Sequence, residues 1–537
     1  MNLFFMKDKT MNSETILSKY RDSLFSSGLH RTGIRWIDSS LHSTEISRGT
    51  IEQESNWRAN FLTEKVCRPG DHVFLFLQFS PEIWYFFLGA LKCGAVPCVL
   101  FPNFGADALT ARLKIGKADF LVTDKAGIKF QPFFVSVPTL RRTLVCGGLP
   151  DTTVDGNICL FDEAEKTRLS EQFTEAPVRP DDPAFMVFTS GSTGFPKAVL
   201  HSQRIAGAIV RSMRNVLQVT AEDRYWCTAH PAWITGTVYS VLGPLLCGVE
   251  AIQYAGNFHA KRWMPILQDQ KVSVWYSAPT AFRSLMNEPA AFFKKFDFSA
   301  IRDVFSVGEP LNPKVFDWGK ETFGREIHDT WFQTEAGTIR IANLPGAVIR
   351  PGFMGKAVDD ARPVILNEQN QETAPTEIGR LCLEEGWDSC FADYFGQRSA
   401  FAEKFRSGYY ETGDLASSDP DGNIRFVGRN DNVINTFGHL VGPFEVESVL
   451  LEEDEILDVA VASAPDELLY EKVVAFIVLR EGISLDSKLE SRLRVSVTTR
   501  LSPYATPKLF IPVPWIPRNN AGKVLRKELR ERLRPEI

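Results

Sequence analysis

Cysteine and histidine are sparse in this 537-residue sequence, and neither is grouped as a disulfide framework or a metal site requires. The nine cysteines are scattered, their number is odd, and no CxxC occurs. This pattern disfavours a disulfide scaffold or a structural zinc site and favours a reducing, cytoplasmic compartment. The eight histidines are also dispersed, and we do not expect His201, His230 or His439 to be metal ligands.

Long hydrophobic runs and an excess of one charge sign are also missing. The first ten residues, MNLFFMKDKT, contain too short an apolar run for a signal-peptide core. The most apolar region, 72–101, is interrupted by charged residues and prolines and is expected to form a strand, a helix and a strand. The 60 basic and 66 acidic residues leave a net charge of −6. We therefore expect no nucleic-acid partner and no membrane association.

The composition is that of a large globular protein, with 44% hydrophobic and 23% charged residues. Short apolar segments alternate with helical stretches over most of the first four hundred residues. This alternation predicts an α/β fold with mixed, mostly parallel sheets flanked by helices. Strands are expected at 119–124, 142–148, 184–190, 272–278 and 303–309.

A second, smaller domain is predicted after a turn-rich segment that precedes Asn423. We place the boundary between residues 430 and 431, which gives domains of 1–430 and 431–537; one continuous domain is the alternative. The second domain is expected to be α+β. Its helices are predicted at 443–452, 488–501 and 523–534, and its strands at 456–464, 472–480 and 508–513.

The segment TSGSTGFPK, from Thr189 to Lys197, predicts a phosphate-binding loop. Glycines allow close backbone approach, while amides, hydroxyls and the lysine supply donors and positive charge. The spacing does not fit GxxxxGK[ST], so an ordinary P-loop NTPase is disfavoured. A polar surface loop is the structural alternative. The residues concerned are Thr189, Ser190, Gly191, Ser192, Thr193, Gly194 and Lys197.

Four charged residues elsewhere suit the same chemistry, although each also has an ordinary structural interpretation. Glu335 beside a phosphate loop is a natural Mg²⁺ ligand, or a solvated surface group. Asp414 in a Gly-Asp turn can accept ribose hydroxyls, or cap the turn. Arg429 suits ribose or phosphate oxygens, or a surface ion pair. Lys523 can stabilise charge on a phosphate, or lie in a solvated basic tail.

TSGSTGFPK resembles the phosphate-loop motif of the AMP-forming adenylate-forming (ANL) superfamily. Four further matches follow in the family's order, and the resemblance covers nearly the whole chain. They are GEP (308–310), DTWFQTEAG (329–337), YYETGDLA (409–416) with GRNDNVINTFG (428–438), and PRNNAGKVLRKEL (517–529).

The resemblance implies a catalytic centre that binds ATP, Mg²⁺ and coenzyme A. Lys523, Glu335 and Thr334 would be catalytic, with Glu335 as the metal ligand. Besides the phosphate loop, ATP and AMP would contact Gly308, Glu309, Pro310, Asp329, Thr330, Trp331, Phe332, Gln333, Asp414 and Arg429. The small domain would be mobile and would rotate about a hinge at Asp431, and Phe437 and Gly438 would line the coenzyme A channel.

The segment DTWFQTE further resembles DTWWQTE of acetyl- and propionyl-CoA synthetases. Phe332 then replaces the second tryptophan, which closes the acetate pocket in those enzymes. A smaller side chain there predicts a short-chain acid larger than acetate, unless Phe332 only packs in the core. The pocket positions, Trp233, Ile234, Thr235, Val307 and Phe332, carry no charge, which disfavours an amino acid as substrate.

Three functions remain open at this stage. The first is an AMP-forming acyl-CoA synthetase, acting as a monomer or small homo-oligomer. The second is an enzyme that loads a carrier-protein phosphopantetheine, because Leu440 stands where many acyl-CoA synthetases carry arginine. The third is a non-catalytic sensor of nucleotide or acyl-adenylate, which the presence of Lys523, Glu335, Asp414 and Arg429 disfavours.

Overall fold

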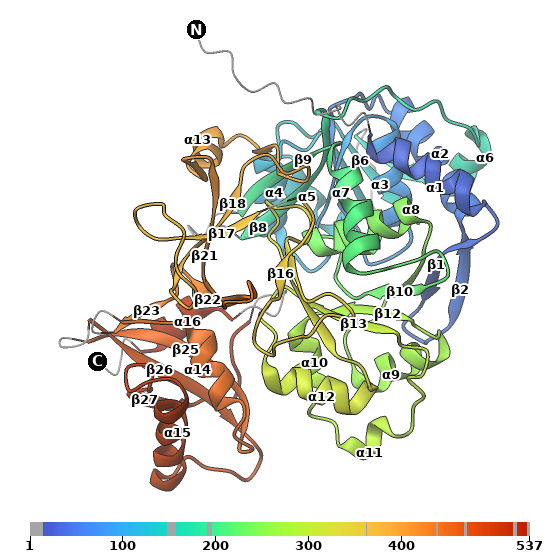
Figure 1. Cartoon of the computed structure of the whole chain (residues 1–537). Coiled ribbons are helices and arrows are strands. Elements are labelled where there is room, and N and C mark those ends of the chain that lie inside the picture. The colour runs from blue at the N-terminus through green and yellow to red at the C-terminus, as the bar shows by residue number, and fades with distance from the viewer. Residues whose placement is uncertain are drawn as a thin grey trace.

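The computed structural model describes residues 14–147, 157–190, 196–360, 362–436, 439–466, 470–518 and 524–533. These residues form a large α/β domain and a smaller C-terminal domain, drawn in orange and red in Figure 1. Within these ranges, no helix is long and apolar enough to cross a bilayer. The nine cysteines are free thiols.

Two largely parallel sheets build the large domain, as the alternation of strands and helices predicts. The five-stranded sheet is parallel throughout and has the order β4 (Val96–Val99), β3 (His72–Phe76), β5 (Phe120–Asp124), β6 (Arg142–Cys146) and β7 (Ile158–Phe161). The nine-stranded sheet has the order β16 (Lys356–Ala357), β15 (Ile341–Ala342), β14 (Ile327–Trp331), β13 (Asp303–Val307), β12 (Val274–Ser277), β10 (Arg224–Cys227), β11 (Glu250–Tyr254), β1 (Thr32–Ile37) and β2 (Ser43–Ser47). The edge strands β2 and β16 and the strand β15 next to β16 run antiparallel to their neighbours.

Helices cover both faces of the nine-stranded sheet, so alternate residues of its strands enter different cores. Val274 and Tyr276 of β12 join the core that includes α1 (Ile16–Ser27), α2 (Arg48–Glu64), α3 (Glu82–Lys92), α7 (Ile205–Arg211) and α8 (Gly243–Cys247). Trp275 faces the other core, with α9 (Ala260–Asp269), α10 (Pro279–Leu285), α11 (Ala290–Phe293) and α12 (Pro313–Phe323). Burial on both faces explains why β12 carries apolar or aromatic side chains at three successive positions, Val274 to Tyr276.

Antiparallel strands form the remaining sheets of the large domain. The predicted strand at 184–190 is β8 (Pro183–Ser190), and its partner is the antiparallel β9 (Pro196–Ser202), not a following helix. The short strand β19 (Asp393–Tyr394) completes this sheet. A five-stranded antiparallel sheet contains β17 (Pro363–Leu366), β18 (Gly379–Glu384), β20 (Phe405–Arg406), β21 (Tyr409–Ser418) and β22 (Ile424–Arg429).

The C-terminal domain packs helices on both faces of one sheet, which explains its separate core. Val459 and Val461 face α14 (Pro443–Leu450) and α15 (Ser487–Arg500), whereas Ala460 faces α16 (Arg526–Arg532). The sheet contains β23 (Ile434–Thr436), β24 (His439–Val441), β25 (Ile456–Asp466), β26 (Tyr470–Leu479) and β27 (Leu509–Pro512). The domain boundary at 430/431, between β22 and β23, stays a prediction.

Four other short helices complete the described α-helical structure. They are α4 (Ala106–Ile115), α5 (Gln131–Phe134), α6 (Glu163–Arg168) and α13 (Arg398–Ala402).

Candidate active site

One cavity of about 1020 Å³ gathers most of the predicted site residues. It lies at the carboxyl ends of parallel strands β10 to β14, where α/β proteins usually bind ligands. The predicted residues that line it are Thr189, Lys197, Trp233, Ile234, Thr235, Val307, Gly308, Glu309, Pro310, Asp329, Thr330, Trp331, Phe332, Gln333, Thr334, Glu335, Asp414 and Arg429.

The other predicted residues do not line this cavity or are not described. Ser190 ends β8, and Asp431 follows β22 with an exposed side chain. Gly191, Ser192, Thr193, Gly194, Phe437, Gly438 and Lys523 lie outside the described residues. Their predicted roles therefore stay predictions.

Asp414 is a buried carboxylate held from both sides. Arg429 Nη1 donates to Oδ1 over 2.9 Å. The Trp331 indole and the Gln333 amide donate to Oδ2 over 3.1 and 2.9 Å. These contacts tie the 331–333 segment to the Asp414–Arg429 pair and orient the carboxylate at the cavity wall.

Glu335 is held by residues of the neighbouring antiparallel sheet. The Tyr394 hydroxyl donates to Glu335 Oε1 over 2.6 Å, and the Phe391 amide donates to the Glu335 carbonyl over 3.0 Å. His201 Nε2 donates to the Thr334 carbonyl over 2.9 Å. Burial lowers the pKa of His201 to about 4, so the ring is neutral at pH 7.

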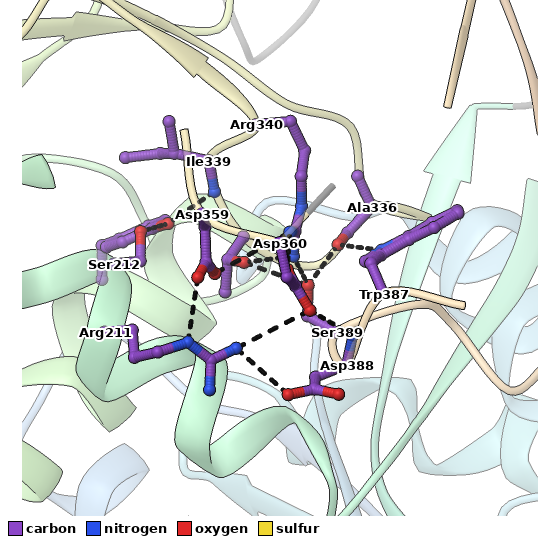
Figure 2. Close-up of polar contacts among 12 residues, drawn as sticks. Arg211, Ser212, Ala336, Ile339, Arg340, Asp359, Asp360, Trp387, Asp388 and Ser389 are labelled. Atoms are coloured by element: carbon purple, nitrogen blue, oxygen red, sulfur yellow. Dashed lines mark hydrogen bonds and ion pairs between the residues drawn. The ribbon is translucent and has the colours of Figure 1, made fainter. Parts of the chain in front are cut away.

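A buried polar network fixes the turn that follows Glu335 (Figure 2). The Ala336 carbonyl accepts from Ser389 Oγ at 2.6 Å and from the Trp387 indole at 3.0 Å. The fully buried Arg340 donates to Asp360 at 2.6 Å and also to Ser389. This network holds the backbone without using the Glu335 carboxylate.

The predicted acyl pocket is apolar and is made of rigid, packed side chains. Ile234 and Val307 are buried, and the Trp233 ring packs 4.9 Å from Phe101. The Phe332 ring packs edge-on against Tyr239, with 5.5 Å between centroids. Phe332 therefore packs against the core and lines the cavity at once.

Three predicted nucleotide residues already have partners within the protein. Glu309 forms an ion pair with Arg283. Asp329 accepts from Ser306 Oγ at 2.6 Å, and burial raises its pKa to about 7. Thr330 Oγ1 donates to the Ser306 carbonyl over 2.6 Å. These contacts join the ends of β13 and β14 and shape the cavity wall.

The C-terminal domain closes one side of the cavity. Arg518 and Val524, the described residues on either side of 519–523, both line it, as do Glu447 and Arg526 of an ion pair. Lys314 of the large domain donates to the Leu451 carbonyl over 3.0 Å, at the end of α14. The described residues of β23 and β24 do not line the cavity.

Sequence reasoning missed several residues of the cavity wall. Arg283 lies in the segment YSAPTAFRSLM, and its place in the site becomes evident only from its ion pair with Glu309. Tyr394, Lys404 and His230 also line the cavity, but they lie outside the sequence motifs predicted to bind phosphate or ribose. Burial lowers the pKa of Lys404, whose ammonium donates to the Glu411 carbonyl over 3.2 Å.

The donor chemistry at Glu335 fits a magnesium ion. Mg²⁺ is usually bound by one or two carboxylates together with substrate phosphates, not by a protein cage. Within the described ranges, no group of three or more His, Cys, Asp or Glu side chains could hold a metal ion. Glu335, at the cavity wall, would supply one carboxylate to such a site.

Comparison with known protein families identifies the class to which this two-domain protein belongs. The model of the AMP-binding enzyme family matches residues 37–387, and that of the AMP-binding enzyme C-terminal domain matches 445–523. The first match covers more than half of the chain, so the protein belongs to the AMP-binding enzyme family.

Relatives and solved structures extend this assignment. The chain is 38% identical to the acetyl-coenzyme A synthetase of Bacillus subtilis (strain 168) over 485 residues, 89% of this chain and 84% of that protein. It is 30% identical to the crystal structure of a Brucella canis acyl-CoA synthetase, with a TM-score of 0.75, covering 98% of this chain and 95% of that one. The anthranilate CoA ligase AuaEII, in complex with anthranoyl-AMP, is 24% identical with a TM-score of 0.87 and 98% coverage of both chains, and shares the fold.

Proposed function

We propose that this protein is an ATP-dependent acid–thiol ligase that activates a short-chain carboxylic acid as acyl-adenylate and transfers the acyl group to coenzyme A. AMP and diphosphate are the other products. The observation that carries the proposal is the single cavity: it combines the Asp414–Arg429 pair, Glu335 with Lys197, and an uncharged pocket at Phe332. The acetyl-coenzyme A synthetases among the relatives support this reaction class.

In the first half-reaction the substrate carboxylate is the nucleophile. Its oxygen bonds to the α-phosphorus of ATP, the bond from that phosphorus to the bridging oxygen breaks, and diphosphate leaves. Negative charge grows on the phosphate oxygens, and Lys523 and Lys197 stabilise it. The cavity-lining positions of Arg518 and Val524 support the assignment of Lys523.

Each remaining predicted residue has a binding role in this step. Asp414 accepts hydrogen bonds from the ribose hydroxyls, and Arg429 keeps that carboxylate ionised and oriented. Thr334 and Glu335 would hold magnesium, and the ion would supply neutralisation of the phosphate charge. The remaining phosphate-loop and GEP residues contact the nucleotide.

The acid is larger than acetate, because Phe332 leaves a deeper pocket floor than tryptophan. The wall residues Trp233, Ile234, Thr235 and Val307 provide no carboxylate to pair with a substrate ammonium. One methylene in such a pocket changes discrimination by only ~1–3 kcal/mol, so preference is broad.

In the second half-reaction the small domain turns about Asp431, and the 437–438 segment admits the thiol. Free coenzyme A is the favoured acceptor; a carrier-protein phosphopantetheine is the second candidate, because Leu440 is exposed where arginine is common. The enzyme acts in the cytoplasm, as a monomer or small homo-oligomer. The free thiols of its nine cysteines support a reducing compartment.

The test is a diphosphate-release assay with straight acids of two to eight carbons and with aryl acids, in the presence and absence of coenzyme A. We expect the highest kcat/KM for an acid of three to five carbons, and thioester formation with coenzyme A alone. A preference for acetate would contradict the assignment of the pocket. If the thioester forms only on a carrier protein, the acceptor is a carrier-protein phosphopantetheine and not free coenzyme A.

A further inference from the structure

Tyr394 lies between the two charged groups that the proposed reaction needs at the phosphates. Its hydroxyl donates to Glu335 Oε1 over 2.6 Å. Its ring centroid lies 4.8 Å from the ammonium nitrogen of Lys197. All three residues line the same cavity. One side chain therefore contacts both an acidic and a basic group of the site.

The strand pairing explains this position. Tyr394 pairs with Val199 across β19 and β9, and Lys197 is two residues before Val199. Residues two apart on a strand share a face, so Lys197 extends over the same face as the tyrosine. The Ala392 amide also donates to the Leu200 carbonyl over 2.7 Å, which fixes β19 against β9.

The two contacts are chemically different. The Tyr394 hydroxyl donates a hydrogen bond to one oxygen of the Glu335 carboxylate. A carboxylate that accepts at one oxygen is held in one orientation for a metal ion at the other. The aromatic face attracts the Lys197 ammonium and leaves N–H donors available for a phosphate.

We propose that Tyr394 is a positioning residue for this reaction, which orients Glu335 toward magnesium and Lys197 toward the nucleotide phosphates. The inference rests on the proposed function. It also separates two roles within one side chain: the hydroxyl acts on the metal carboxylate, and the ring acts on the lysine.

The turn after Glu335 does not depend on Tyr394. Figure 2 shows the Ala336 carbonyl bound by Trp387 and Ser389, and Arg340 donates to Ser389. The Glu335 carbonyl has its own donor in the Phe391 amide. Removing the tyrosine hydroxyl therefore changes the carboxylate and leaves the backbone in place.

The experiment compares Tyr394→Phe, Tyr394→Leu and wild type in acid-dependent exchange of labelled pyrophosphate into ATP, titrated with magnesium and with ATP. Tyr394→Phe should raise the half-saturating magnesium concentration about tenfold, because the variant loses a hydrogen bond to a charged group. The KM for ATP, measured at saturating magnesium, should change less. Tyr394→Leu should show the same magnesium defect and also raise that KM about threefold or more. Tyr20→Phe, which removes a buried hydroxyl from α1 outside the cavity, is the matched control and should leave both values unchanged.

An unchanged magnesium requirement in Tyr394→Phe would overturn the proposal, as would a fall in kcat that is equal at every magnesium concentration. If Tyr394→Leu does not fold, as judged by its circular dichroism, the tyrosine-to-phenylalanine titration still decides the hydroxyl's role. Absence of exchange in the wild-type enzyme contradicts the proposed function itself. If the wild-type enzyme catalyses exchange and Tyr394→Phe has the same magnesium requirement as wild type, only the role of Tyr394 is contradicted.

Discussion

Asp414 and Arg429 are directly opposite each other on antiparallel strands β21 and β22, joined by a 2.9 Å ion pair. The carboxylate is 4% exposed and the guanidinium side chain 29% exposed. A buried carboxylate costs free energy unless it is paired and hydrogen-bonded, and this one has both kinds of partner. Contacts within the protein therefore already orient the pair at the cavity wall.

Replacing Asp414 with asparagine should raise the KM for ATP about tenfold to a hundredfold, because a hydrogen bond to a charged group contributes ~1.5–3 kcal/mol. Steady-state kinetics of diphosphate release would measure it. Asp421→Asn, at an exposed carboxylate beyond β21, is the control and should behave as wild type. An unchanged KM in Asp414→Asn would remove this residue from the nucleotide site.

Shortening Phe332 to alanine should shift preference toward longer acids. Removal of the ring deepens the pocket, and each methylene accommodated is worth ~1–3 kcal/mol, so the ratio of kcat/KM for hexanoate over propionate should rise at least tenfold. Phe133→Ala, at an exposed phenylalanine of α5, should leave the ratio unchanged. The same acid ranking in Phe332→Ala and wild type would mean that this ring only packs against Tyr239.

Lys314 should favour the domain arrangement in which the first half-reaction occurs. Its ammonium caps the carboxyl end of α14 through the carbonyls of Leu451 and Glu452, at 3.0 and 3.4 Å. Such a contact contributes ~0.3–1 kcal/mol, so Lys314→Ala should slow pyrophosphate exchange about two- to fivefold. Thioester formation from supplied acyl-adenylate should not slow.

The matched control for Lys314 is Lys320→Ala on the same helix, α12. Lys320 pairs with Glu326 within the large domain and should leave both half-reactions unchanged. Equal slowing of both half-reactions in Lys314→Ala would show that the contact serves the fold and not the domain arrangement.

His201 should make the protein less stable in mild acid. Burial lowers its pKa from 6.5 to about 4, so its contribution to stability is complete above pH 6.5 and is lost as the pH falls toward 4. His201→Gln keeps an amide donor for the Thr334 carbonyl and does not titrate. Its Tm should therefore fall less than that of wild type between pH 7 and pH 4.5. His30→Gln, at an exposed histidine, is the control; a wild-type slope in His201→Gln would contradict the assignment.

The motif residues could be singled out from the sequence because each motif is a short run of neighbouring residues. The run from Asp329 to Glu335 begins within β14 and continues beyond its end, and all seven residues line one cavity. Periodicity was also sufficient for the C-terminal elements, such as the helix predicted at 488–501, which is α15 at Ser487–Arg500.

Tertiary contacts could not be predicted in this way. Arg283 has a role only through Glu309, and Tyr394 only through Glu335 and Lys197, residues far apart in the chain. The direction of β9 was missed as well, because an apolar run at 184–188 does not reveal whether a helix or an antiparallel strand follows.

In the proposed mechanism a bound organic acid attacks ATP at a site completed by Lys523. The most direct measurement is exchange of labelled pyrophosphate into ATP by the purified enzyme, with magnesium and a panel of carboxylic acids. We predict acid-dependent exchange in wild type, and none in Lys523→Ala, which should still convert supplied acyl-adenylate to thioester. Absence of exchange with every acid, or equal loss of both half-reactions in Lys523→Ala, would contradict the account.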